Sequence, residues 1–218
     1  MTIHRGQPVL AAGRPPAEAD AAMVVLHGRG GSAEDILSLA AELNRPELAY
    51  VAPQAAGHTW YPYSFLAPLE QNEPGLSSAL ELLGDLVAHL EQGGIPAERI
   101  FLLGFSQGAC LSLEFAARNA KRYGGVVALS GGLIGPPGTP RDYPGANPGA
   151  FAGTPVFLGC SDRDPHIPKD RVDESARVFE RMGAAVTERI YPAMGHTVNE
   201  DELDFVRGLL TPWVTAAQ

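Results

Sequence analysis

The stretch IFLLGFSQGACLSLEFAA, residues 100–117, decides the fold of this chain. Residues 100–103 are apolar, which is typical of a buried strand, and residues 109–117 are apolar nearly all round, which is typical of a buried helix. Between them, residues 104–108 match the pattern G-x-S-x-G, whose glycines permit a tight strand-to-helix turn. Such a turn holds a serine at a helix N-terminus, where developing negative charge is favoured. The stretch therefore predicts a nucleophilic Ser106, and a capping serine in a glycine-rich turn is the alternative.

The rest of the chain alternates short apolar runs with segments of helical period. This alternation predicts an α/β fold with a mainly parallel central sheet, helices on both faces and a single domain over residues 1–218. In such sheets ligands bind outside the carboxyl ends of the strands, so functional residues should follow strands. Strands are expected at residues 22–26, 48–52, 100–103, 126–129, 155–158 and 186–191, helices at 32–43, 76–90, 109–117, 172–182 and 203–213, an irregular loop at 54–74 and an ordered surface loop at 131–153.

Composition excludes several classes of function. The net charge is −9 and no basic run is present, which argues against a nucleic-acid partner. No apolar run approaches 18 residues, so no membrane span is expected, and the first 20 residues lack the apolar core of a secretory signal, which favours a cytoplasmic location. Cys110 and Cys160 form no metal-ligand pattern, so neither a metal nor an organic cofactor is expected. The oligomeric state stays open, a homodimer included.

A serine nucleophile needs a general base, and the base needs an acid to orient it. His196 follows the last predicted strand and precedes the last helix, which makes it the candidate base. Asp164 and Asp162 both lie in the turn after the strand that ends near residue 158. Asp164 is the favoured acid, because the following Pro165 biases it to an extended backbone that aims its carboxylate away from the turn.

Four other histidines are not expected to take part in catalysis. His4 near the terminus and His89 within a helix are expected to be solvated. His27 is interpreted as a structural hydrogen-bonding residue behind the glycine-rich loop that ends the first predicted strand. His166, two residues after Asp164, is expected to be exposed, with a place at the pocket rim as the alternative.

The loop that follows the first predicted strand, His27-Gly-Arg-Gly-Gly31, supplies backbone N–H groups near a strand end. Together with the N–H of the residue after the nucleophile, such groups hold the oxyanion of acyl transfer. The donors here would be Arg29 and Gln107. A phosphate-binding glycine loop is the alternative, but the loop lacks the spacing and the lysine of such motifs. Aromatic side chains in the 54–74 loop would wall a substrate pocket or plug the sheet edge: Trp60, Tyr61 and Phe65.

Five blocks carry a family resemblance: VVLHGRGGSAEDI (24–36), LLGFSQGA (102–109), VALSGG (127–132), GCSDRDPHIP (159–168) and GHTV (195–198). In this order and spacing they resemble the phospholipase/carboxylesterase family of α/β-hydrolases, which includes acyl-protein thioesterases and small bacterial esterases. The resemblance runs from about residue 23 to the end of the chain. It implies an α/β-hydrolase fold, a triad of Ser106, Asp164 and His196, and an oxyanion hole of the Arg29 and Gln107 amides.

The sequence thus predicts a serine carboxylesterase acting on small-molecule esters of short to medium acyl chains through an acyl-enzyme. The bulky segment 60–63, placed after a strand, is expected to narrow the mouth of the site and to favour compact acyl groups. An acyl thioesterase or lysophospholipase is the alternative within the hydrolases. A non-catalytic binding protein on a hydrolase fold is the less favoured alternative from another class.

Overall fold

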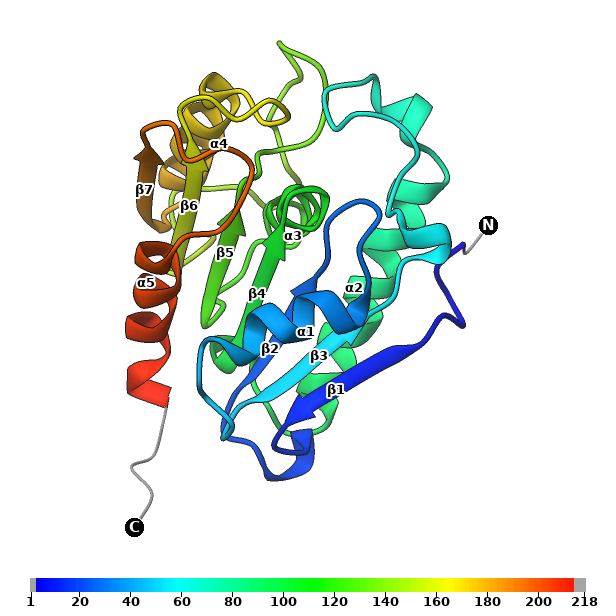
Figure 1. Ribbon diagram of the computed structural model, residues 1–218, viewed down its shortest axis with the longest axis vertical. Helices are drawn as coiled ribbons and strands as arrows, with labels where there is room; N and C mark the ends of the chain where they lie inside the picture. Colours follow the sequence, from blue (N-terminus) through cyan, green and yellow to red (C-terminus); the bar gives the residue numbers. More distant parts are fainter. Residues whose placement is uncertain (1–2, 214–218) are drawn as a thin grey trace.

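A seven-stranded sheet in the order β1-β3-β2-β4-β5-β6-β7 forms the centre of the molecule, a computed structural model that describes residues 3–213 (Figure 1). Strands β2 to β7 are parallel, and β1 pairs antiparallel with β3 along one edge. The predicted mainly parallel α/β sheet is therefore confirmed. The strands are β1 (Val9–Gly13), β2 (Ala22–Leu26), β3 (Ala49–Pro53), β4 (Ile100–Phe105), β5 (Gly125–Leu129), β6 (Pro155–Ser161) and β7 (Ala185–Tyr191).

Helices cover both faces of the sheet, as predicted. Helices α1 and α5 bury their apolar sides with one set of strand residues, and α2, α3 and α4 bury theirs with the alternate set. In Figure 1, α1 and α5 lie in front of the sheet. The α-helices are α1 (Ala33–Ala41), α2 (Gly75–Gln92), α3 (Gln107–Arg118), α4 (Lys169–Arg181) and α5 (Glu200–Leu210), and short 3-10 helices lie at Pro16–Glu18, Ala56–His58, Leu69–Asn72, Ala97–Arg99 and Thr211–Trp213.

Strand β1 is not predicted by the sequence. Its side chains are exposed except for Leu10, which is half-buried, because the strand lies at the sheet edge beside β3. An exposed edge strand needs neither an apolar run nor a strict alternation, so its sequence carries little signal.

The long loop at 131–153 is only partly a surface loop. Residues 131–135 are buried, which corrects the expectation for this part. The Arg171 side chain of α4 donates from Nη1 to the carbonyls of Leu133 and Gly135, both at 2.6 Å. These bonds satisfy backbone groups that burial would otherwise leave unpaired.

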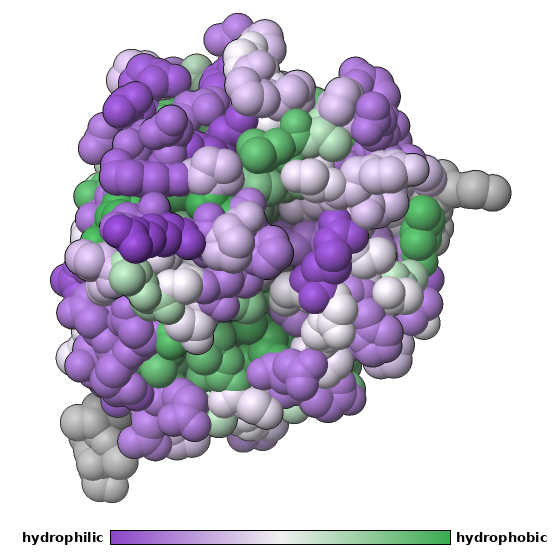
Figure 2. Space-filling view, turned by 45° about the horizontal axis from the view of Figure 1, so that its top comes forward, coloured by the Kyte–Doolittle hydropathy of each residue, from purple (hydrophilic) through white to green (hydrophobic). Residues whose placement is uncertain are grey.

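The carboxyl ends of the parallel strands point to the upper half of Figure 1, where the loops that carry the candidate site residues gather. Figure 2 shows a mainly hydrophilic surface on the side turned to the viewer, with apolar residues gathered in a few separate areas. Within residues 3–213, no helix combines the length and the apolarity needed to cross a bilayer.

Candidate active site

The candidate site begins at the carboxyl end of β4, where the chain turns sharply into α3. Ser106 occupies this turn with φ 55° and ψ −118°, a backbone conformation that residues other than glycine rarely adopt. A Cβ on Gly104 would lie 2.2 Å from the Gly108 carbonyl oxygen, and one on Gly108 would lie 2.2 Å from that of Leu26. The two glycines of the motif are therefore required by close backbone approach, and the Ser106 side chain is held at the N-terminus of α3.

Two hydrogen bonds link Ser106 to His196 and Asp164. His196 lies in the loop at 192–199 between β7 and α5, with its Nε2 2.8 Å from Ser106 Oγ and its Nδ1 2.7 Å from Asp164 Oδ2. An ionised carboxylate only accepts hydrogen bonds, so Nδ1 carries the imidazole proton and Nε2 accepts from the serine hydroxyl. The fold thus joins three residues that lie after three different strands.

Neighbouring rings and a backbone bond hold His196 in place. Its ring centroid lies 5.0 Å from that of Phe105 and 4.8 Å from that of His166. The Gly195 N–H donates to Ser161 Oγ at 3.2 Å, which ties the histidine loop to the end of β6. His166 itself is exposed, as expected, and also lines the cavity beside the serine.

The carboxylate of Asp164 is fully buried and well supplied with donors. Its Oδ1 accepts from the backbone N–H groups of His166 (2.8 Å) and Ile167 (3.0 Å), while Oδ2 faces the imidazole. Burial by itself raises the pKa of the Asp164 carboxyl, but the hydrogen bonds from the imidazole and the two amides outweigh it and keep the pKa below its usual value. Asp162 is exposed and accepts instead from the Ala193 N–H at 2.7 Å.

His27 holds the loop that follows β2. Its Nε2 accepts from the Ala55 N–H at 3.1 Å, so its Nδ1 carries the proton and donates to the Gly28 carbonyl at 2.7 Å. The side chain is buried, and burial lowers the pKa of His27, which keeps the ring neutral. The structural interpretation of His27 is confirmed.

Trp60 corrects the expectation that it walls a substrate pocket. Its side chain is fully buried and is absent from the described lining of the cavity beside Ser106. Its indole N–H donates to the His27 carbonyl at 2.9 Å, so the residue supports the loop after β2 from behind. No local sequence signal distinguishes this inward position from a place in the pocket wall.

His4 corrects a second expectation, because it is buried instead of solvated. Its Nδ1 accepts from the Ala56 N–H at 3.1 Å, and its Nε2 therefore donates to the Trp60 carbonyl at 2.9 Å. Burial lowers the pKa of His4. The segment before β1 thus packs against the 54–74 loop, a long-range contact that the local sequence does not reveal.

The side chain of Gln107 ties the 54–74 loop to the serine turn. Its Oε1 accepts from the Trp60 N–H at 2.9 Å, and its Nε2 donates to the Tyr61 carbonyl at 2.8 Å. The sequence predicted a role only for the backbone N–H of Gln107 and gave no sign of this second contribution. A buried amide side chain that bonds to a distant loop produces no recognisable spacing of residues in the sequence.

A cavity of ≈ 600 Å³ opens beside Ser106 and His196. Tyr61 and Phe65 line it, and their part in binding a substrate stays a prediction. The other lining residues are Gly28, Arg29, Pro62, Tyr63, Ser64, Phe105, Gln107, Cys110, His166 and Ile167.

A second cavity of ≈ 520 Å³ lies on the α1 side of His196. It shares Gly28, Arg29, Phe105 and His196 with the first cavity, so the two meet at the candidate site. Its remaining wall is partly apolar and comes from the loop after β2, from α1 and from the histidine loop: His27, Gly31, Asp35, Ile36, Leu39, Thr197 and Val198.

The two thiols offer no alternative nucleophile. Cys110 and Cys160 are buried and unpaired, and burial raises the pKa of each thiol to about 12. The reactive thiolate is therefore scarce at neutral pH. Among the described residues, no group of three or more His, Cys, Asp or Glu side chains is arranged to hold a metal ion.

A buried acid lies at the start of α5, directly after the histidine loop. Asn199 and Glu202 form a reciprocal capping box there, with the Asn199 N–H donating to Glu202 Oε2 at 2.9 Å. Glu202 is fully buried, its Oε1 has no hydrogen-bond partner among the described residues, and a Cβ on Gly159 would lie 2.1 Å from that oxygen. Burial raises the pKa of Glu202 to about 7.

Comparison with known proteins identifies the family. The chain matches the family model described as Phospholipase/Carboxylesterase over residues 8–214. It is 31% identical over 208 residues to acyl-protein thioesterase 1 of Candida albicans, which covers 85% of this chain and 88% of that protein.

Solved structures show the same fold. A crystal structure of a phospholipase/carboxylesterase from Dyadobacter fermentans superposes with a TM-score of 0.90 at 48% identity, covering 96% of this chain and 99% of that one. The crystal structure of esterase PE8 has a TM-score of 0.75 at 25% identity and covers 95% of this chain and 98% of that one. Because the family model spans nearly the whole chain, this protein belongs to the phospholipase/carboxylesterase family and has the α/β-hydrolase fold.

Proposed function

We propose that this protein is a serine carboxylesterase that hydrolyses short- to medium-chain esters through an acyl-enzyme. The observation that carries the proposal is the unbroken hydrogen-bonded chain from Ser106 Oγ through His196 to Asp164, at a cavity wide enough for a small ester. The family membership and the relatives named as esterases support it.

The geometry supports one assignment of proton transfers. Ser106 Oγ attacks the ester carbonyl while its proton passes to His196 Nε2 over the 2.8 Å hydrogen bond. The buried Asp164 carboxylate stabilises the imidazolium that forms. The imidazolium then gives the proton to the leaving alcohol oxygen, and a water molecule attacks the acyl-enzyme by the same route to release the acid and regenerate the serine.

Two backbone N–H groups would bind the oxyanion of the tetrahedral intermediate, those of Arg29 and Gln107. The Gly28 carbonyl accepts from His27 Nδ1 and from the Gly31 N–H, and in a planar trans peptide the Arg29 N–H points away from that carbonyl. A Cβ on Gly28 would be 3.3 Å from Ser106 Cβ, so this loop lies against the serine turn. The Arg29 N–H donates to no other group among the described residues. Gln107 is the first residue of α3, so its N–H has no partner within the helix and adds to the positive end of the helix dipole.

The shape of the cavity favours compact acyl groups. Tyr61 and Phe65 wall it, and the Arg29 side chain bonds to the carbonyls of two further lining residues, Pro62 and Tyr63. We expect kcat/KM to fall from butanoyl to palmitoyl p-nitrophenyl esters. A steady rise along this series would reject the assignment of compact acyl groups.

A thioesterase activity is the second candidate, because a relative of 31% identity is named acyl-protein thioesterase 1. The same serine chemistry cleaves both bond types. Matched oxygen and sulfur esters of one acyl chain, assayed with one enzyme preparation, give the ratio of kcat/KM that separates the two candidates.

The direct test of the proposed function is labelling with a fluorophosphonate, which reacts with an activated serine. We expect one label per chain on the wild type, located at Ser106 by peptide mapping, together with hydrolysis of p-nitrophenyl butanoate. Ser106→Ala should abolish both, while its circular dichroism spectrum stays unchanged. A folded wild type that neither labels nor hydrolyses any ester in the series would support the non-catalytic alternative.

A further inference from the structure

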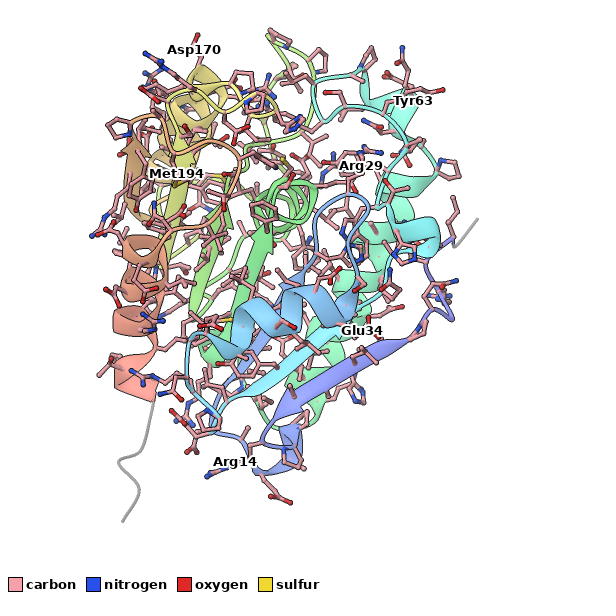
Figure 3. All side chains as sticks on the ribbon, in the orientation of Figure 1. Arg14, Arg29, Glu34, Tyr63, Asp170 and Met194 are labelled. Atoms are coloured by element: carbon pink, nitrogen blue, oxygen red, sulfur yellow. The ribbon has the colours of Figure 1, made fainter. Side chains whose placement is uncertain are left out.

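We propose that the Arg29 guanidinium binds a carboxylate on the acyl part of the substrate, so that the preferred esters are monoesters of compact dicarboxylic acids. This inference rests on the proposed function and names its substrate class. The first observation is the position of Arg29, directly after Gly28 in the loop beside Ser106, with a side chain that lines the same cavity as the serine. Arg29 is exposed, and Figure 3 shows it in the upper half, between α3 and the segment that carries Tyr63.

The side chain is held at a fixed place in the cavity wall. Its Nη1 donates to Thr59 Oγ1 and to the Pro62 carbonyl, both at 2.9 Å, and its Nη2 donates to the Tyr63 carbonyl at 2.5 Å. Its guanidinium carbon lies 5.9 Å from the centre of the Tyr61 ring. A pre-positioned cation loses little side-chain entropy when it binds a ligand.

The charge of Arg29 is uncompensated. All three groups that accept its hydrogen bonds are neutral, and it takes part in none of the ion pairs within residues 3–213, whereas Arg118, Arg171 and Arg207 each pair with a carboxylate. The described lining of the cavity includes no Asp or Glu side chain. In a protein of net charge −9, this cavity therefore presents positive charge to a ligand.

One edge of the guanidinium is free for a ligand. Arginine has five N–H donors, and the hydrogen bonds above use three of them. The remaining two are the Nε–H and one Nη2–H, and Nε and Nη2 lie on the same side of the planar group. Two parallel N–H donors of this kind match the two oxygens of a carboxylate.

The position of His196 assigns the carboxylate to the acyl part. The leaving oxygen has to reach His196 Nε2 to take its proton, so the alcohol part lies on the side of the histidine loop. Arg29 is bonded to the segment 59–63 instead, and Figure 3 shows Arg29 and Met194, a residue of the histidine loop, on opposite sides of α3. The second cavity, on the α1 side of His196, leaves room for the alcohol; Arg29 lines this cavity as well, but there the acidic side chain of Asp35 also contributes to the wall.

The test compares two esters of similar size, p-nitrophenyl hydrogen glutarate and p-nitrophenyl pentanoate, after subtraction of the spontaneous rates. We expect the wild type to prefer the glutarate by about tenfold in kcat/KM, the scale of one added charged hydrogen bond. Arg29→Gln and Arg29→Met should bring this ratio close to one, and Arg29→Lys should keep most of it. The matched control is Arg14→Gln, which removes the same charge from an exposed position at the lower end of the molecule and should keep the ratio (Figure 3).

The ratio separates recognition from a merely structural role. Loss of the bonds from Arg29 to the 59–63 segment would lower kcat/KM for both esters and leave the ratio unchanged, and that result would overturn the proposal. In the wild type the ratio should also fall with added NaCl, because salt screens an exposed ion pair; this measurement needs no variant.

Two further outcomes are decisive. A wild type that hydrolyses both esters equally well overturns the inference and leaves the proposed function intact. A preference for 4-acetoxybenzoate over phenyl acetate, with none for the glutarate, would move the carboxylate to the alcohol part and overturn the assignment made here. Absence of both ester hydrolysis and fluorophosphonate labelling would overturn the proposed function and, with it, this inference.

Discussion

Asp164 Oδ2 lies 2.7 Å from His196 Nδ1, although 32 positions separate the two residues in the chain. The contact forms because β6 and β7 are parallel neighbours in full register, so the loops that follow them leave the sheet side by side. The backbone amides on Oδ1 hold the carboxylate in its ionised form. Asp162, in the same turn, faces the backbone of the histidine loop instead.

Asp164→Asn should lower kcat by about 10⁴-fold without unfolding the protein, because an amide no longer holds the imidazole in the correct tautomer or stabilises its charge. The matched control is Asp162→Asn. Its amide oxygen still accepts from the Ala193 N–H, so we expect most of the activity to remain with a modest loss of stability. Steady-state kinetics and urea unfolding of both variants check this, and exchanged phenotypes would make Asp162 the acid.

Ser106→Ala and His196→Ala should each reduce kcat by at least about 10³-fold, and the double variant should lose little more. The physical reason is that the histidine has no proton to accept once the serine hydroxyl is gone. The measurement is kcat for p-nitrophenyl butanoate with protein purified free of host esterases. Losses that multiply in the double variant would show that the two residues act independently.

His27→Leu should lower kcat by about 10- to 100-fold with little change in KM, because it removes the shorter of the two hydrogen bonds to the Gly28 carbonyl and so loosens the Arg29 N–H; the other bond comes from the Gly31 N–H at 3.1 Å. Outright loss of an oxyanion donor costs about 10²–10³-fold. His27→Asn should recover part of the loss, since its amide N–H approaches the position of Nδ1. The control is His58→Leu, because His58 makes the equivalent bond to the Gly31 carbonyl, three peptide groups along the chain from the one that carries the Arg29 N–H. A rise in KM with an unchanged kcat would contradict the role of His27.

Glu202→Gln should flatten the dependence of unfolding free energy on pH. Burial raises the pKa of Glu202 from 4.5 to about 7, so the native state holds its proton more tightly than the unfolded state does. The stabilisation is therefore complete below the unfolded pKa and is lost as the pH rises through about 7. Urea unfolding at pH 5 and pH 8 should show a wild-type loss of up to about 3 kcal/mol from this group, reduced in the variant. An unchanged slope would contradict the assignment.

The sequence predicted the parallel sheet and the convergence of Ser106, Asp164 and His196 because each lies directly after an apolar strand. In a parallel sheet, strand ends meet at one edge whatever the distance along the chain. It failed for Trp60 and His4, whose positions depend on how the segment before β1 packs against the 54–74 loop. That packing is a tertiary contact and does not appear as a periodic pattern in the sequence. The role of the Gln107 side chain escaped notice for the same reason.

The crowded backbone around the serine turn bears on how this protein could change under selection. Gly104 and Gly108 admit no larger side chain, since even a methyl group would collide with a neighbouring carbonyl. Tyr63 and His166, by contrast, are exposed residues at the cavity, on loops that tolerate replacement. Mutant libraries aimed at new substrates should therefore spare the turn and sample the rim, where a change of side chain alters the shape of the entrance without moving the nucleophile.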